Sequence, residues 1–227
     1  MTEPLRLVVF DVDGTLVDSQ ADIVAGMTHA FKHVGRAAPS RDAILQTVGL
    51  SLPQTMRMLA PKASEAERAD LVTTYKTTYR NLRINAGSKA SSPLYDGIDA
   101  MLRSLRQFDP LLLGVATGKS RRGLDILLET HGIRDCFVTT QCADDHPSKP
   151  HPSMVMAALS DTGVHAENAV IVGDTSFDMA MGKAASISTI GVTWGYHTRE
   201  NLADADVLVD SVDVLLNTLT TWMETRI

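Results

Sequence analysis

Short apolar runs recur along the chain, and amphipathic stretches separate most of them. One run lies at LRLVVFD (5–11), and five more follow after residue 90. These five are LLLGVAT (111–117), CFVTT (136–140), NAVIVGD (168–174), ISTIGVTW (187–194) and DVLVD (206–210). The stretches between them predict helices over 97–108, 121–132, 152–163, 176–185 and 211–225. Strands that alternate with helices predict a parallel sheet with helices on both faces, which is an α/β, Rossmann-like three-layer core.

The interval between the first two predicted strands breaks this alternation. It holds four helical patterns, separated by Gly and Pro, and no strand pattern. The expected helices span 21–35, 40–49, 52–60 and 64–83. We therefore predict a discontinuous core of residues 1–17 and 90–227 with an α-helical domain, residues 18–89, inserted into it. An insertion at this point would sit over the end of the first strand, and SKASSPLYDG (88–97) would lead back to the core.

Composition narrows the class of protein. Of the 227 residues 44% are hydrophobic, and the net charge is −6 without any Lys/Arg-rich run, which argues against a nucleic-acid partner. The apolar runs are shorter than the roughly 20 residues of a membrane-spanning helix, and MTEPLRLVVF lacks the pattern of a signal peptide. Cys136 and Cys142 have neither a disulfide-framework nor a metal-ligand spacing. We expect a cytoplasmic protein with no membrane partner.

Polar side chains stand where several predicted strands end. Asp11 and Asp13 follow the first strand, and Thr117 closes the second. Lys149 follows the third strand, and Asp174 closes the fourth. Because ligands bind beyond the carboxyl ends of parallel strands, we expect these side chains to converge on one pocket.

This set of side chains favours one kind of chemistry. Clustered carboxylates repel one another unless a cation or a proton neutralises them, and an oxygen-only ligand set suits Mg²⁺. Asp11, Asp174 and the Asp13 backbone carbonyl are the expected metal ligands, while Lys149 and Thr117 would face a bound anion. A carboxylate nucleophile beside Mg²⁺ predicts phosphoryl transfer through an aspartyl phosphate on Asp11. Asp13 would protonate the leaving oxygen and then deprotonate the attacking water.

Four segments together resemble the four motifs of the haloacid dehalogenase superfamily, in the order of that family. They are Asp11-Val-Asp13-Gly14-Thr15, Thr117, Lys149 and Gly173-Asp174-Thr-Ser-Phe-Asp178. The helical insertion resembles the type-1 α-helical cap of the phosphatase branch, and DVDGTLVDS and VTWGYH are most similar to phosphoglycolate phosphatases. The resemblance implies the roles given above for Asp11, Asp13, Thr117, Lys149 and Asp174, and it makes Asp178 a metal ligand or a partner of the metal's water shell.

Further residues are candidates for binding phosphate or substrate. Gly14, Thr15 and Gly118 are candidate phosphate contacts; Gly118 stands where many relatives have Asn, which leaves substrate selection open there. Arg57 in the helical insertion could reach the substrate. Three cations, Lys119, Arg121 and Arg122, begin a predicted helix, where the helix dipole disfavours positive charge, and this indicates an anion nearby.

Structural alternatives remain for several of these residues. Asp13-Gly14 could form a simple turn, and Thr117 could cap a helix. Asp178 could stabilise the N-terminus of its helix, and Lys149 could be a solvated charge. The cations at 119–122 could form a basic solvated turn.

We predict a Mg²⁺-dependent phosphatase of a small phosphorylated metabolite, with 2-phosphoglycolate as the best candidate. A sugar phosphomutase or a pyrophosphatase of the same superfamily would use the same residues. A dehalogenase does not need the second acid, so Asp13 and Asp174 argue against that reaction. From a different class, a phospho-accepting receiver or an inactive scaffold would also combine Asp, Thr and Lys on a parallel sheet, although a receiver carries its acceptor on a middle strand of a smaller chain.

Overall fold

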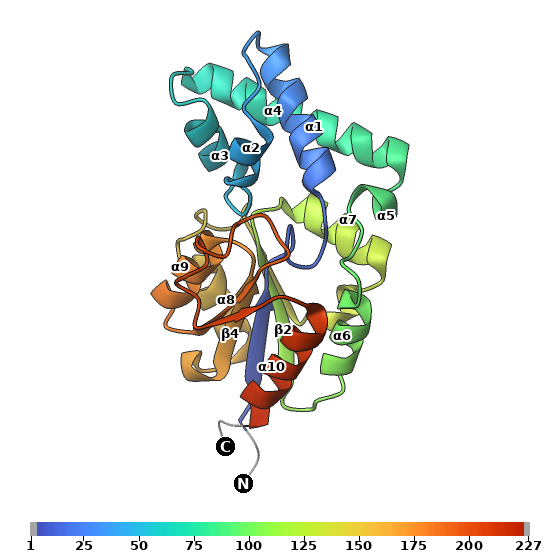
Figure 1. The fold of residues 1–227 in the computed structure, drawn as a ribbon, viewed down its shortest axis with the longest axis vertical. Coiled ribbons are helices and arrows are strands. Elements are labelled where there is room, and N and C mark those ends of the chain that lie inside the picture. Colours follow the sequence, from blue (N-terminus) through green and yellow to red (C-terminus); the bar gives the residue numbers. More distant parts are fainter. Residues whose placement is uncertain (1–3, 225–227) are drawn as a thin grey trace.

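The computed structural model describes residues 4–224, in which six strands form one parallel sheet (Figure 1). The strands are β1 (Arg6–Phe10), β2 (Leu111–Thr117), β3 (Thr139–Cys142), β4 (Ala169–Gly173), β5 (Ser188–Val192) and β6 (Val207–Val209). Their spatial order is β3-β2-β1-β4-β5-β6. This is the strand order of a doubly wound Rossmann-type sheet, so the predicted α/β fold class is confirmed.

Helices cover both faces of the sheet because side chains along a strand point alternately to its two faces. Val8 and Phe10 of β1 pack with α6 (Ile98–Leu105), α7 (Arg121–His131) and α10 (Val212–Glu224). Leu7 and Val9 pack with α8 (Ser153–Thr162) and α9 (Ser176–Ala184) on the other face. All five residues of β1 are buried, as expected of a central strand covered on both sides.

The register of the central strands brings the predicted site residues to one edge. Phe10 at the end of β1 lies beside Val115 of β2 and Val172 of β4. The next residue, Asp11, therefore emerges beside the ends of both neighbours, and its backbone N–H donates to the Val172 carbonyl at 2.9 Å. Because these neighbouring strands are parallel, their carboxyl ends lie at the same edge of the sheet. Residues that are far apart in the sequence therefore meet at this edge.

A helical unit stands over this edge of the sheet, and we call it the cap (Figure 1). It consists of α1 (Gln20–His33), α2 (Arg41–Leu45), α3 (Leu52–Leu59) and α4 (Glu65–Ala86). A capping box between Ser64 and Glu67 starts α4. The cap has its own apolar cluster, which includes Met27, Ile44 and Leu71. The domain boundaries at residues 18 and 89 stay a prediction.

Some elements differ from the sequence prediction. The third strand was expected at 136–140 but runs from Thr139 to Cys142, because Arg134–Cys136 forms a 3-10 turn and Phe137 packs edge-on against Phe10 in the core. The return linker contains a short helix, α5 (Ser88–Ser91), and a 3-10 turn (Ala166–Asn168) precedes β4. The last predicted helix, 211–225, ends outside the described residues. Among residues 4–224, no helix has the length and apolarity needed to cross a membrane.

Candidate active site

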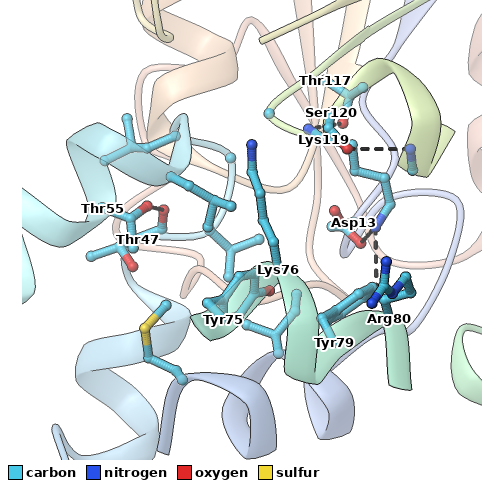
Figure 2. A pocket seen from close by; sticks show the side chains of 18 of the residues that line it. Asp13, Thr47, Thr55, Tyr75, Lys76, Tyr79, Arg80, Thr117, Lys119 and Ser120 are labelled. Carbon is cyan, nitrogen blue, oxygen red and sulfur yellow. Dashed lines mark hydrogen bonds and ion pairs between the residues drawn. The ribbon is translucent and has the colours of Figure 1, made fainter. Parts of the chain in front are cut away.

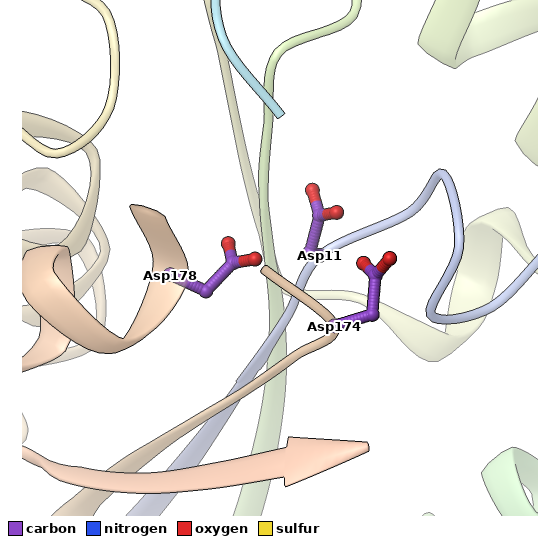
Figure 3. A group of neighbouring side chains, drawn as sticks. All are labelled: Asp11, Asp174 and Asp178. Carbon is purple, nitrogen blue, oxygen red and sulfur yellow. The ribbon is translucent and has the colours of Figure 1, made fainter. Parts of the chain in front are cut away.

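Three buried aspartates meet at the edge of the central strands (Figure 3). Asp11 follows β1, Asp174 follows β4, and Asp178 lies in the first turn of α9. One carboxylate oxygen from each lies within 4.8 Å of the other two. The structure therefore brings Asp11 and Asp174 together, and Asp178 lies with them.

Lys149 is fully buried between two of these carboxylates. Its Nζ lies 2.7 Å from Asp11 Oδ1 and 2.6 Å from Asp178 Oδ1. The other oxygen of Asp178 accepts bonds from the Thr175 backbone N–H at 3.1 Å and the Thr175 hydroxyl at 2.6 Å, which completes a capping box at the start of α9. Asp178 thus stabilises the N-terminus of α9 and also holds Lys149 against Asp11. The alternative of a helix-terminal role for Asp178 therefore does not exclude its place in the site.

The carboxylate of Asp174 is enclosed on every side by short contacts. Its Oδ1 accepts from the Thr15 hydroxyl at 3.0 Å, and its Oδ2 accepts from the Tyr196 backbone N–H at 2.8 Å. A β-carbon added at Gly14 or Gly195 would lie 2.1 or 2.2 Å from Asp174 side-chain atoms, and Gly14 also has a positive φ of 85°. Thr15 and the absence of a side chain at Gly14 fix the orientation of Asp174, and the role of these two residues as phosphate contacts stays a prediction.

The donor set fits a divalent cation. Asp11 Oδ2 is buried and, among the described residues, has no hydrogen-bond partner. Burial raises the pKa of Asp11 to about 7, and burial together with Asp11 and Asp178 raises the pKa of Asp174 well above its usual range. Lys149 pairs with Asp11 and Asp178 but not with Asp174, so three ionised carboxylates and one ammonium leave two negative charges, which one divalent cation would balance. Oxygen ligands of this kind are those that Mg²⁺ prefers.

Asp13 forms a second charged pair beside the triad. Its Oδ1 lies 2.7 Å from Lys119 Nζ and also accepts a bond from the Ser19 hydroxyl. Lys119 donates to the Tyr79 hydroxyl of α4 at 3.5 Å, and its ammonium group lies 5.4 Å from the centre of the Tyr79 ring. Lys119 therefore connects the predicted acid/base residue to the cap. The contacts from Lys119 and Ser19 both go to Oδ1 of Asp13.

Asp11 and Asp13 line a cavity of about 390 Å³ between the core and the cap, and Figure 2 shows Asp13 among its lining residues. The core contributes Thr117, Gly118 and Lys119 from the loop after β2. The cap contributes side chains from all four of its helices. A cavity of this size is within the usual range for small-molecule sites.

Gly118 of the core lies against the backbone of a cap loop. A β-carbon at Gly118 would lie 2.6 Å from the Gly49 carbonyl oxygen and 2.7 Å from the Leu50 carbonyl oxygen. The backbone N–H of Ser51, the next residue of this cap loop, donates to the Ser148 hydroxyl of the core at 2.8 Å. Backbone atoms of the cap occupy the space that a side chain at Gly118 would need. The absence of a side chain there therefore does not widen the pocket.

Two predicted substrate contacts lie elsewhere. Arg57 is exposed on α3 and is not among the residues that line the cavity. Arg121 bonds to the Thr140 hydroxyl, the Thr140 carbonyl and Asp145, so its guanidinium is bound to β3 and the loop that follows it. Lys119 and Arg122 do line the cavity. The interpretation of the cations at 119–122 as an anion site is therefore wrong for Arg121.

Sequence reasoning missed the cap residues that line the cavity. Lys76, Arg80 and Arg83 of α4 are at helical spacings of four and three residues, and Tyr79 lies among them. This spacing puts the three cations on one face of the helix, a pattern that was readable in the sequence. Nothing in the sequence indicated that this face turns toward the core.

A doubly wound α/β sheet with a buried carboxylate cluster at its carboxyl edge and a helical cap over it defines a class of hydrolytic enzymes. Residues 8–192 match the model of the haloacid dehalogenase-like hydrolases, and the chain belongs to this family. The probable phosphatase IndB of Dickeya dadantii (strain 3937) is 35% identical over 210 residues, which cover 90% of this chain and 89% of IndB. A phosphoglycolate phosphatase of Agrobacterium fabrum is 29% identical over 212 residues, which cover 92% of this chain and 90% of that protein. The predicted family resemblance is confirmed.

A solved structure shows the same fold. A haloacid dehalogenase-like hydrolase from Streptococcus pneumoniae superposes with a TM-score of 0.81 at 24% identity, over 95% of this chain and 98% of that one. At this identity the likeness concerns the fold.

Proposed function

We propose that this protein is a Mg²⁺-dependent phosphatase that hydrolyses a small phosphorylated metabolite through an aspartyl phosphate. The observation that carries the proposal is the unpaired, buried Oδ2 of Asp11 beside Lys149, in the lining of a cavity to which Asp13 also belongs. The names of the two relatives above, both phosphatases, support the same class of reaction.

In the first half-reaction a carboxylate oxygen of Asp11 attacks the phosphorus atom, and the bond from phosphorus to the leaving oxygen breaks. Asp13 gives a proton to that oxygen, so the alcohol leaves uncharged. Lys149 and Thr117 hold the phosphoryl oxygens. In the second half-reaction water attacks the same phosphorus atom, Asp13 takes its proton, and inorganic phosphate leaves a regenerated Asp11 carboxylate.

Asp11, Asp174 and the Asp13 backbone carbonyl would hold Mg²⁺, with Asp178 close enough to contact its water shell. A bound Mg²⁺ supplies positive charge that keeps the carboxylates ionised and stabilises negative charge on the transferring phosphoryl group. The surrounding chain does the rest: Thr15 and the Tyr196 N–H orient Asp174, and Asp178 orients Lys149. The cap excludes water from the reacting atoms.

Among substrates, 2-phosphoglycolate is one specific candidate, supported by the relative of that name. A phosphomutase or a pyrophosphatase would use the same aspartates and lysine, and both are outcomes of the test below. Membership of the hydrolase family argues against the phospho-accepting receiver. We further propose a cytoplasmic location, supported by two buried cysteines that are both free thiols.

The test is phosphate release from a panel of phosphomonoesters and pyrophosphate, with Mg²⁺ and with Mg²⁺ removed by EDTA. Asp11→Asn and Asp13→Asn are the matched variants, since each keeps the shape of the side chain. We expect wild-type turnover that needs Mg²⁺ and falls at least ~10³-fold in both variants, the size of effect seen when an essential nucleophile or base is removed. Phosphate release that survives Asp11→Asn would overturn the aspartyl-phosphate route. Transfer to a second substrate hydroxyl without phosphate release would indicate a mutase.

A further inference from the structure

The cavity extends well beyond the space that a reacting phosphoryl group needs, and its far walls belong to the cap. A volume of about 390 Å³ lies within the range of about 300–1,000 Å³ that is typical of sites for drug-sized ligands. Under the proposed phosphatase function, on which this inference rests, the extra space would receive the part of the substrate that leaves as the alcohol.

One wall of this space is apolar. Ile23 and Met27 of α1, Ile44 of α2 and Leu52 of α3 line it. Three of them, Ile23, Met27 and Ile44, are also members of the buried apolar cluster of the cap, so this wall is a continuation of the cap core. Thr47 and Thr55 also belong to the lining, but both hydroxyls donate to backbone carbonyls within the cap, so this wall suits hydrocarbon or an aromatic ring better than a sugar or a polyol.

Another part of the lining is strongly basic. It holds Lys76, Arg80 and Arg83 of α4 and Arg122 of α7. Within residues 4–224, none of these four cations forms an ion pair. In Figure 2 the Lys76 side chain extends from α4 into the space between that helix and the loop that carries Thr117.

The acidic residues of the lining do not neutralise these cations. Asp11 and Asp13 are paired with Lys149 and Lys119 at the catalytic end. The third, Asp144, accepts a bond from the Arg121 backbone N–H at 2.8 Å and keeps its negative charge, which offsets only one of the four cations. Four unpaired cations around one cavity are a marked local excess in a chain whose net charge is −6. Charge complementarity therefore favours an anionic ligand group here.

We propose that the natural substrate is a phosphomonoester whose leaving group has an apolar, flat or branched body and carries a second anionic group, a carboxylate or a phosphate. The body lies on the wall of Ile23, Met27 and Leu52, and the second anion is bound by Arg80 and Arg83 with Lys76 beside them. A two-carbon acid such as glycolate offers the second anion but no body to bury.

Three aryl phosphates distinguish the contribution of the apolar body from that of the second anionic group. Phenyl phosphate has the apolar body alone, 4-carboxyphenyl phosphate adds a carboxylate, and benzene-1,4-diyl bisphosphate adds a phosphate. 2-Phosphoglycolate has the anion without the body. We expect the wild-type enzyme to show the highest kcat/KM for one of the two aryl substrates with a second anion, and the better one identifies the anion. Equal kcat/KM for phenyl phosphate and both doubly anionic aryl substrates would overturn the proposal, and so would a preference for 2-phosphoglycolate over all three.

Arg80→Ala and Arg83→Ala are the test variants, and Lys32→Ala is the control. Lys32 is an exposed cation of the cap that does not line the cavity, so its loss changes the charge of the cap equally. We expect the test variants to raise KM for the doubly anionic substrate about tenfold, the effect of about 1.4 kcal/mol, with kcat unchanged. KM for phenyl phosphate should not move in any variant. An equal rise in KM for phenyl phosphate would show that the arginines maintain the fold and do not bind a second anion.

Failure of this inference is distinguishable from failure of the phosphatase proposal. If phenyl phosphate is hydrolysed but the second anion confers no advantage, only the inference fails. If no phosphomonoester is hydrolysed, the phosphatase proposal fails, and binding still tests the inference. Calorimetry with phenylphosphonate and 4-carboxyphenylphosphonate measures whether the cavity binds a second anion. If 4-carboxyphenylphosphonate binds more tightly and Arg80→Ala removes the difference, the inference is supported. Equal affinity of the two compounds for the wild type refutes the inference.

Discussion

Replacing Gly118 by alanine tests whether the cap and the core meet in the working enzyme as they do in this structure. Gly118 lies in the loop after β2 and faces the cap loop that joins α2 to α3. A β-carbon at Gly118 would lie 2.6 Å from the Gly49 carbonyl oxygen and 2.7 Å from that of Leu50. Both neighbours are backbone atoms, so no change of rotamer can relieve the overlap.

The size of the effect follows from these distances. Carbon–oxygen contacts between packed backbone segments are about 3.3–3.6 Å, so the two loops must move apart by roughly 0.7 Å. Overpacking of this kind costs about 1–3 kcal/mol. If turnover requires the closed cap, the ratio of closed to open molecules falls by a factor on the order of 5 to 150, and kcat/KM falls by up to that factor.

The assay is phosphate release from phenyl phosphate with Mg²⁺, together with the thermal midpoint Tm of each variant. Gly35→Ala is the control, because Gly35 lies in the cap with a φ of 70° and an added β-carbon would meet nothing within 4 Å. The left-handed backbone costs alanine about 1–2 kcal/mol there, so this variant should lose stability but keep its kcat/KM. If Gly118→Ala retains wild-type kcat/KM and Tm, the two loops are not in contact during turnover and the reasoning is wrong.

Two further predictions concern groups that join the core to the cap. Lys119→Met should lower the free energy of unfolding by about 3 kcal/mol, because it leaves the largely buried Asp13 carboxylate without its ion pair. Urea denaturation measures this loss of stability, and an unchanged urea midpoint would contradict the prediction. Burial lowers the pKa of His197, whose Nδ1 accepts from the Ser176 N–H at 3.2 Å and whose Nε2 lies 3.3 Å from the Gln46 carbonyl of the cap. The imidazole of His197 binds a proton more readily in the unfolded chain than in the folded one. The stabilisation that the neutral imidazole gives the folded state is therefore complete above the unfolded pKa of about 6.5. It is lost as the pH falls through the lower pKa of the folded state. Urea midpoints measured from pH 8 to pH 5 should therefore fall more steeply for the wild type than for His197→Gln, and parallel curves would refute this.

Much of the catalytic end could be read from the sequence because it depends on local order. A buried strand places the next residue at the edge of the sheet, so Asp11, Thr117 and Asp174 could be assigned to one edge from the apolar runs that precede them. The same reasoning predicted the parallel sheet and the helical insertion. It placed the third strand too early, because an apolar pair at Phe137 and Val138 resembles a strand whether or not the backbone pairs there.

The contacts between the cap and the core could not be read in this way. Gly118 is a glycine because the backbone of Gly49 and Leu50 occupies the space of its side chain, and Arg121 bonds to β3 while its neighbour Arg122 faces the cavity. The contact at Gly118 depends on how the cap packs on the core, and the contacts of Arg121 depend on how α7 packs on the sheet. Periodicity assigns a residue to a face of its own helix or strand, but only the packing of one unit on the other decides what that face meets. The sequence alone therefore determined which side chains stand at the strand ends, and the tertiary structure decided the shape and charge of the space in which a substrate would lie.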